Sequence, residues 1–208
     1  MTERYDEHYI SSVTALGDTH EVVTSQAVFT RNGIKLVDVG ARINSAFREK
    51  LVQHKLLPPI DQCLTVADGV TQASLRERAR EILDAEPRFQ LIRSALPGVE
   101  RLLNAFYAMP LSPPLAFKLT VAREQRPAVY EHSVQMTLIA LFLAIKSRMS
   151  DRDLATVAAA GMLHDIGDLH IDPELLRPGR RLAAAEMRHV YAHPMTAYLI
   201  LQEYPPFH

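Results

Sequence analysis

The amino-acid sequence predicts a mainly α-helical protein, a helical bundle preceded by a small N-terminal part with a β-hairpin. Three patterns support this fold class. Residues 134–145 are apolar almost all round, as in a helix buried at the centre of a bundle. Ser150 and Asp153 form a capping-box pattern, which favours the start of another helix. Asn-Gly at residues 32–33, between two runs rich in β-branched residues, favours a hairpin.

The N-terminal elements follow from the same local patterns. Residues 1–19 show no strong period, so we expect them to be partly disordered. The hairpin should span residues 22–39, and β-structure should be confined to the first forty-odd residues. The stretch 60–70 is compatible with either a short strand or a loop.

Helices account for most of the remaining chain. Residues 72–83 place Leu75, Ala79 and Ile82 on one face, and the charged residues between them form a solvated face. No strand is expected within 127–165. Other helices are expected at residues 44–54, 89–107 with a break at 97–98, 115–123, 183–192 and 194–202.

Proline-rich residues 109–114 form the expected boundary between two parts of the chain. Residues 1–110 would form the N-terminal part, with a role in packing, dimerisation or sensing. Residues 111–208 would form the helical part that carries the candidate site.

Composition excludes several classes of protein. The chain has 208 residues and a net charge of −1, so no global field favours nucleic acid or an anionic membrane. The N-terminus is charged, and no uninterrupted apolar run has transmembrane length. Cys63 is the only cysteine, which favours a reducing, cytoplasmic compartment and a packed structural thiol rather than a nucleophile.

The adjacent pair His164-Asp165 is the main candidate for chemistry. It presents a ring nitrogen and carboxylate oxygens together, a mixed donor set that suits divalent metals such as Zn²⁺, Fe²⁺ or Mn²⁺. Both residues should lie in the last turn of the helix that begins at Ser150. Gly167 should follow that helix in a left-handed conformation.

Other histidines have two interpretations each. His132, near the start of an apolar helix, would alone be read as a core histidine, but the dyad one element later makes a metal ligand the better interpretation. The small residues at 158–161 should let the two helices pack closely and bring His132 and His164 together. His189 could lend a further nitrogen, but we interpret it as a structural residue or a support for the ligands, and we interpret His170 as an exposed loop residue.

The run His-Asp-Ile-Gly-Asp-Leu-His-Ile-Asp-Pro-Glu-Leu-Leu at 164–176, followed by Arg-Pro-Gly and later by His193-Pro194, resembles the HD superfamily of metal-dependent phosphohydrolases. It resembles more narrowly the HD-GYP branch, whose members hydrolyse cyclic di-GMP. The resemblance covers roughly residues 127–204 and implies an HD-type helical bundle. It implies a divalent metal (Fe, Mn, Mg or Zn) held by His132, His164, Asp165 and His193, with Asp165 as the catalytic residue that bridges metals or orients water.

Three departures from the family pattern bear on activity. Asp168 stands where the family commonly has a lysine that meets substrate phosphate, and Ala128 stands where trinuclear members have a further carboxylate. The family's later His-His pair, Gly-Tyr-Pro loop and aspartate would lie beyond His208, so we expect the domain to be incomplete at its C-terminus. Arg177, Arg180 and Arg181 would either bind substrate phosphate or form a solvated basic loop.

Two functions follow from these residues. The first is a cytoplasmic, signalling phosphohydrolase of the HD/HD-GYP type, weak or inactive in this chain. Its expected partners are a cyclic dinucleotide or another phosphoester and a second copy of the chain, with neither duplex nucleic acid nor a membrane. The alternative is a non-catalytic signalling or interaction module on the same scaffold.

Overall fold

The computed structural model describes residues 6–177, 179–205 and 207, and it confirms a mainly helical fold with a small hairpin. The α-helices are α1 (Glu7–Thr19), α2 (Arg48–Val52), α3 (Gln72–Ala85), α4 (Gln90–Ala95), α5 (Glu100–Ala108), α6 (Pro113–Gln125), α7 (Pro127–Lys146), α8 (Asp151–Leu163), α9 (Ala184–Val190) and α10 (His193–Leu201). The strands are β1 (Val22–Thr24), β2 (Val28–Phe29), β3 (Lys35–Val37) and β4 (Leu64–Val66). Short 3₁₀-helices are η1 (Ser45–Phe47), η2 (Ile60–Gln62), η3 (Pro87–Phe89), η4 (Ile166–His170) and η5 (Pro173–Leu176).

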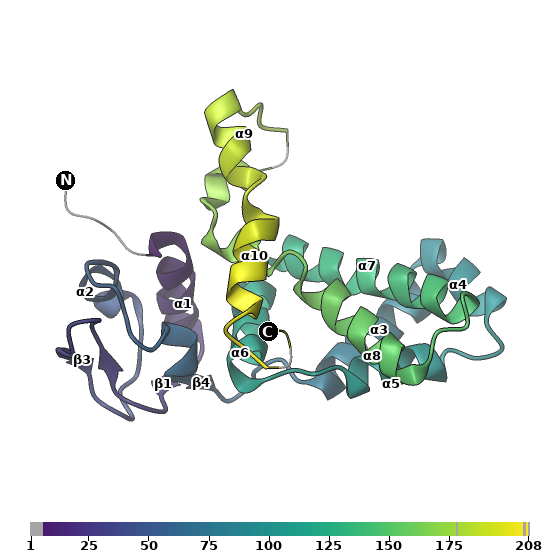
Figure 1. Cartoon of the computed structure of the whole chain (residues 1–208), viewed down its shortest axis with the longest axis horizontal. Helices are drawn as coiled ribbons and strands as arrows, with labels where there is room; N and C mark the ends of the chain where they lie inside the picture. Colours follow the sequence, from purple (N-terminus) through teal and green to yellow (C-terminus); the bar gives the residue numbers. More distant parts are fainter. Residues whose placement is uncertain (1–5, 178, 206, 208) are drawn as a thin grey trace.

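Two lobes lie side by side in Figure 1. The first contains α1, α2 and the strands, and the second contains α3, α4, α5, α7 and α8. Helices α6 and α10 lie between the lobes, and α9 projects away from them. The candidate site residues belong to α7, the end of α8 and the start of α10, so the site lies where the second lobe meets this central pair of helices.

The hairpin is shorter than predicted. It joins β2 to β3, with Val28 opposite Val37, and Gly33 takes a positive φ of 79° in its turn. Strand β1 instead pairs antiparallel with β4, with Val22 opposite Val66. The β-structure therefore extends beyond the first forty-odd residues, and the ambiguous stretch 60–70 contains a strand. The pairing of β1 with a distant segment could not be read from a local pattern.

The prediction of partial disorder in residues 1–19 is wrong for residues 7–19, which form α1. Its buried residues include Tyr9, Ile10, Val13 and Leu16, which recur at helical spacing. The packed face of α1 therefore has a period that supports a helix. Residues 1–5 of the stretch lie outside the described part of the chain.

Helix α8 packs very closely on α7. A Cβ atom on Gly161 would lie 2.5 Å from the Thr137 hydroxyl oxygen and 3.0 Å from its Cα, so only glycine fits this contact. The predicted capping box is present at the start of α8. Ser150 accepts a hydrogen bond from the Asp153 backbone N–H at 3.2 Å, and Asp153 accepts one from the Ser150 N–H at 3.3 Å. Residues 127–165, all within the described part, contain no strand, as predicted.

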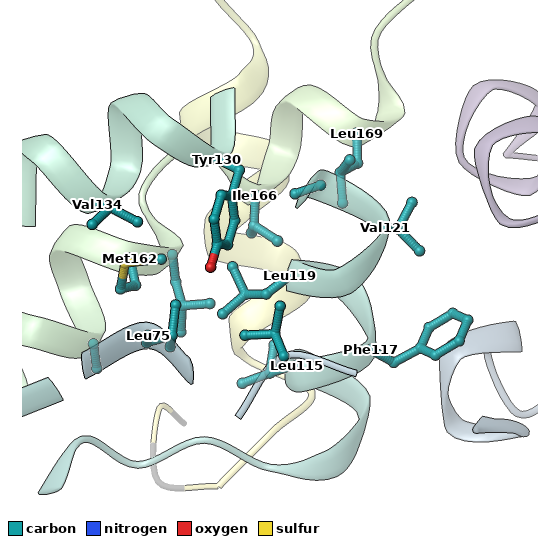
Figure 2. Close-up of a cluster of buried hydrophobic side chains, with 14 of the residues drawn as sticks. Leu75, Leu115, Phe117, Leu119, Val121, Tyr130, Val134, Met162, Ile166 and Leu169 are labelled. Atoms are coloured by element: carbon teal, nitrogen blue, oxygen red, sulfur yellow. The ribbon is translucent and has the colours of Figure 1, made fainter. Parts of the chain in front are cut away.

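A single hydrophobic core links helices from both sides of the predicted boundary at residue 110. Figure 2 shows Leu75 of α3 in one cluster with Leu115 of α6, Tyr130 of α7, Met162 of α8 and Ile166 of η4. These side chains are all nearly or fully buried. The division of the chain at residue 110 stays a prediction, which an unfolding experiment can test.

Among the described residues, α7 is the one helix that is long and apolar enough to cross a membrane, judged by length and composition alone. The core helix of a soluble protein passes the same test, and α7 buries Val134, Leu138 and Leu141 against its neighbours. Its length and composition are therefore weak evidence for a membrane span.

Candidate metal centre

Three helices bring the predicted ligands together. His132 lies on α7, His164 immediately follows α8, Asp165 comes next, and His193 begins α10. The Asp165 carboxylate is the common neighbour: the Nε2 atoms of His132, His164 and His193 lie 3.6, 3.0 and 3.4 Å from its oxygens. The predicted convergence of these four residues is therefore present in the structure.

Backbone carbonyls fix the orientation of two of the histidine rings. Nδ1 of His164 lies 2.8 Å from the Gly161 carbonyl oxygen, and Nδ1 of His193 lies 2.8 Å from the Val190 carbonyl oxygen. A carbonyl can only accept, so each Nδ1 carries the proton and donates it. In the neutral ring, Nε2 then keeps its lone pair for a metal, and in both residues Nε2 is the atom directed at Asp165.

Electrostatics hold Asp165 in its ionised form. Burial alone would raise the pKa of its carboxyl, but the hydrogen bond from His164 and the nearby rings of His193 and His132 outweigh burial and lower that pKa. The same hydrogen bond to Asp165 raises the pKa of His164. An ionised carboxylate facing three imidazole nitrogens is a donor set that fits a divalent metal ion.

Asp168 adds a second carboxylate beside the centre. Its Oδ1 atom lies 3.6 Å from Nδ1 of His193 and is buried without a hydrogen-bond partner among the described residues. Burial raises the pKa of this carboxyl. The carboxylate thus lies against a predicted ligand, and its expected repulsion of a substrate phosphate stays a prediction.

Gly167 has a different role from the one predicted. Its φ is not positive, because the chain continues from α8 into the 3₁₀-helix η4 instead of ending in a left-handed residue. Glycine is required here by close packing: a Cβ atom would lie 2.2 Å from the His193 carbonyl oxygen and 2.9 Å from the Ala197 nitrogen. Gly167 therefore lets η4 contact α10 and place His193 beside Asp165.

The predicted phosphate-binding arginines lie on an exposed turn. Arg177 pairs with Glu174 at 2.8 Å, and Arg180 pairs with Glu186 at 2.5 Å. Pro178 of this turn lies outside the described residues. Binding of phosphate by Arg177, Arg180 or Arg181 stays a prediction.

Sequence analysis missed Arg126, which joins α6 to α7. Its guanidinium is half-buried; burial lowers the pKa of Arg126, whereas the carboxylates of Asp172 and Asp168 oppose that shift. Its Nε atom is buried without a hydrogen-bond partner among the described residues. Arg126 lines a cavity of about 430 Å³ together with Arg48, Gln125 and Asp172. Nothing in the local sequence distinguishes this arginine, because the cavity is formed by α1 and other distant segments.

Two further side chains can be compared with their predictions. Cys63 is fully buried, and burial raises the pKa of its thiol to about 11, which agrees with a packed structural cysteine. The interpretation of His170 as an exposed loop residue is wrong, since its side chain is only 18% exposed. Its ring contacts Asp6 and Tyr9, which belong to a segment that was predicted to be partly disordered.

Residues 129–207 match the family model of the HD domain. The matched range contains all four converging residues. HD domains are typically metal-dependent phosphohydrolases, so the match supports hydrolase function and metal binding in general. No curated protein and no solved structure matches the chain.

Proposed function

We propose that this chain, which carries an HD domain over residues 129–207, is a metal-dependent phosphohydrolase. The convergence of three histidine Nε2 atoms on the Asp165 carboxylate carries the proposal. Surface histidines and carboxylates do not ordinarily share such an arrangement, with two of the rings held by backbone carbonyls.

The residues divide the chemistry between them. A bound divalent metal ion supplies positive charge that polarises a phosphoester and eases the deprotonation of water. His132, His164, His193 and Asp165 would hold the ion, and the backbone bonds of His164 and His193 would keep their rings in place. The ionised Asp165 would orient the attacking water by accepting a hydrogen bond from it. Asp168 would add negative charge beside the ring of His193, with its Oδ1 atom 3.6 Å from Nδ1.

The finer proposal concerns the substrate. We infer a phosphodiester, with cyclic di-GMP as the first compound to test, from the resemblance of residues 164–176 and His193-Pro194 to the HD-GYP branch. Arg126 is a candidate to contact a substrate phosphate, because its half-buried charge lines a cavity and interacts electrostatically with Asp168. The negative charge of Asp168 would repel such an anion, so we expect its turnover to be weak.

The test is a turnover assay of the full chain loaded with Mn²⁺ or Fe²⁺. Substrates are bis-p-nitrophenyl phosphate, cyclic di-GMP and linear dinucleotides. We expect turnover that His164→Ala and Asp165→Ala reduce by about a hundredfold or more, since each removes a contact to the reacting centre. His189→Ala is the matched control, because His189 is an exposed histidine of α9. Arg126→Gln should raise KM more than it lowers kcat.

The same assay separates the alternative, a non-catalytic module on the HD scaffold. That function is supported if the wild-type chain turns over no phosphoester, whereas bound metal in the purified protein would favour the enzyme. Loss of turnover in His189→Ala as large as that in His164→Ala would also contradict the assigned site.

A further inference from the structure

The segment that follows the metal centre is supported by the N-terminal helix. Asp165 leads directly into η4, which ends at His170. Within this short segment, the Asp168 N–H donates to the Asp165 carbonyl at 2.9 Å, and the Ile171 N–H donates to the Asp168 carbonyl at 3.1 Å. Because two successive turns of 3₁₀-helix link these residues, the position of His170 is coupled to the orientation of the Asp165 and Asp168 carboxylates.

His170 is held by two contacts with the start of α1. Its Nδ1 atom lies 2.5 Å from an oxygen of Asp6, the residue that precedes α1. Its ring stacks on Tyr9, with centroids 4.9 Å apart and planes inclined by 28°. These partners lie more than 150 residues earlier in the sequence, outside the range matched by the HD domain.

Tyr9 is itself fixed in the interior. It is fully buried, and Nζ of Lys118 lies 4.0 Å from the centroid of its ring. Lys118 in turn pairs with the buried carboxylate of Asp61 at 3.2 Å. The stacking surface offered to His170 is therefore rigid, because its own neighbours are buried and charged.

A histidine at position 170 lowers the stability of the fold relative to an apolar residue. Its Nε2 atom is buried without a hydrogen-bond partner among the described residues, which costs stability relative to an apolar ring. A phenylalanine would stack on Tyr9 without that cost, but it could not bond to Asp6. The imidazole therefore gives the end of η4 a directed bond to Asp6 that an apolar ring could not supply.

We propose that His170 is a positioning residue for the metal centre, and that Asp6 and Tyr9 of the N-terminal segment hold it in place. Metal affinity then depends on a part of the chain that lies outside the HD domain. This inference rests on the proposed metal centre, because His170 can position the ligands only if they bind a metal ion.

The test uses the full chain and Co²⁺ as the probe. Calorimetry gives the Kd, visible absorption of bound Co²⁺ reports ligand geometry, and thermal unfolding of the metal-free protein reports stability. His170→Ala should weaken Co²⁺ binding by about tenfold to a hundredfold, the usual effect of removing a partner that orients ligands, and should change the spectrum. His170→Asn, which keeps a donor near the position of Nδ1, should recover part of both.

Two controls match these variants. Tyr9→Phe keeps the stacked ring and removes a hydroxyl that has no hydrogen-bond partner among the described residues, so it should leave Co²⁺ binding unchanged. His189→Ala removes an exposed histidine and should do the same. His164→Ala should abolish binding and so establishes the metal centre independently.

The outcomes are distinct. Wild-type affinity and spectrum in His170→Ala, with binding lost in His164→Ala, would overturn the positioning role and leave the metal centre intact. A lower unfolding temperature in His170→Ala with an unchanged Co²⁺ spectrum would identify His170 as purely structural. That outcome would also overturn the positioning role. No Co²⁺ binding by the wild-type chain would overturn both the metal centre and this inference.

Discussion

Asp61 and Lys118 place opposite charges in the interior of the protein, with exposed fractions of 2% and 3%. Asp61 lies on η2 and Lys118 on α6, and their nearest charged atoms are 3.2 Å apart. The Tyr204 hydroxyl also donates to Asp61. Such a pair contributes little net stability compared with apolar residues, but each partner depends on the other to offset its loss of hydration.

Lys118→Met should therefore be strongly destabilising. The substitution leaves the Asp61 carboxylate buried without its counter-charge, at an expected cost of about 3–5 kcal/mol in the free energy of unfolding. Urea denaturation at pH 7 measures this cost. The double variant Asp61→Leu with Lys118→Met should recover most of it, because no buried charge then remains. A cost below about 1 kcal/mol for Lys118→Met would contradict this account.

The adjacent pair His164-Asp165 and the resemblance to the HD superfamily together predicted the four residues that converge at the candidate centre. His164 and Asp165 are adjacent, His132 lies in the second turn of α7, and His193 is the first residue of α10. Arg126 and His170 could not be assigned in the same way. Their surroundings include side chains of α1, and no local pattern records which distant helix packs against a loop.

At the scale of elements, the contact between η4 and α10 depends on the absence of a side chain at residue 167. Gly167→Ala would place a Cβ atom 2.2 Å from the backbone oxygen of His193, so backbone must move. We expect α10 to shift, His193 to leave Asp165, and Co²⁺ affinity to fall by roughly tenfold or more. Calorimetry of the full chain measures the change.

Gly98→Ala is the matched control for that experiment. A Cβ atom on Gly98 would meet no atom within 4 Å, and the φ of Gly98 is not positive. This variant should keep wild-type affinity. Unchanged affinity in Gly167→Ala would show that the η4–α10 contact adapts and that Gly167 does not position His193.

Helix α8 and its continuation into η4 show which features a local sequence pattern can predict and which it cannot. The start of α8 was predicted because its capping box is encoded by neighbouring residues, Ser150 and Asp153. Its continuation into η4 was not, since packing on α10 rather than a local turn preference decides the conformation of Gly167. Strand β1 is similar: its partner β4 lies across two intervening strands and three short helices in the sequence.

At the scale of the whole molecule, the two lobes share one core. Buried residues form a single hydrophobic cluster from Tyr9 of α1 to Tyr204 after α10. Helix α6 contacts α1 in one direction and α7 in the other, and η4 contacts both α1 and α10. The proline-rich residues 109–114 gave a reasonable sequence boundary, yet long-range packing of this kind has no local signature.

A continuous core predicts that both lobes unfold together. Separating the lobes would expose Tyr9 and Leu115, which are fully buried, and would break the Asp61–Lys118 pair. Partial unfolding of the first lobe should thus cost nearly as much as global unfolding. Hydrogen exchange with mass spectrometry, carried out across a urea series, can follow peptides from α1 and α7 separately. Both should lose protection at the same urea concentration, whereas earlier loss in α1 would show a separable N-terminal unit and favour the division at residue 110.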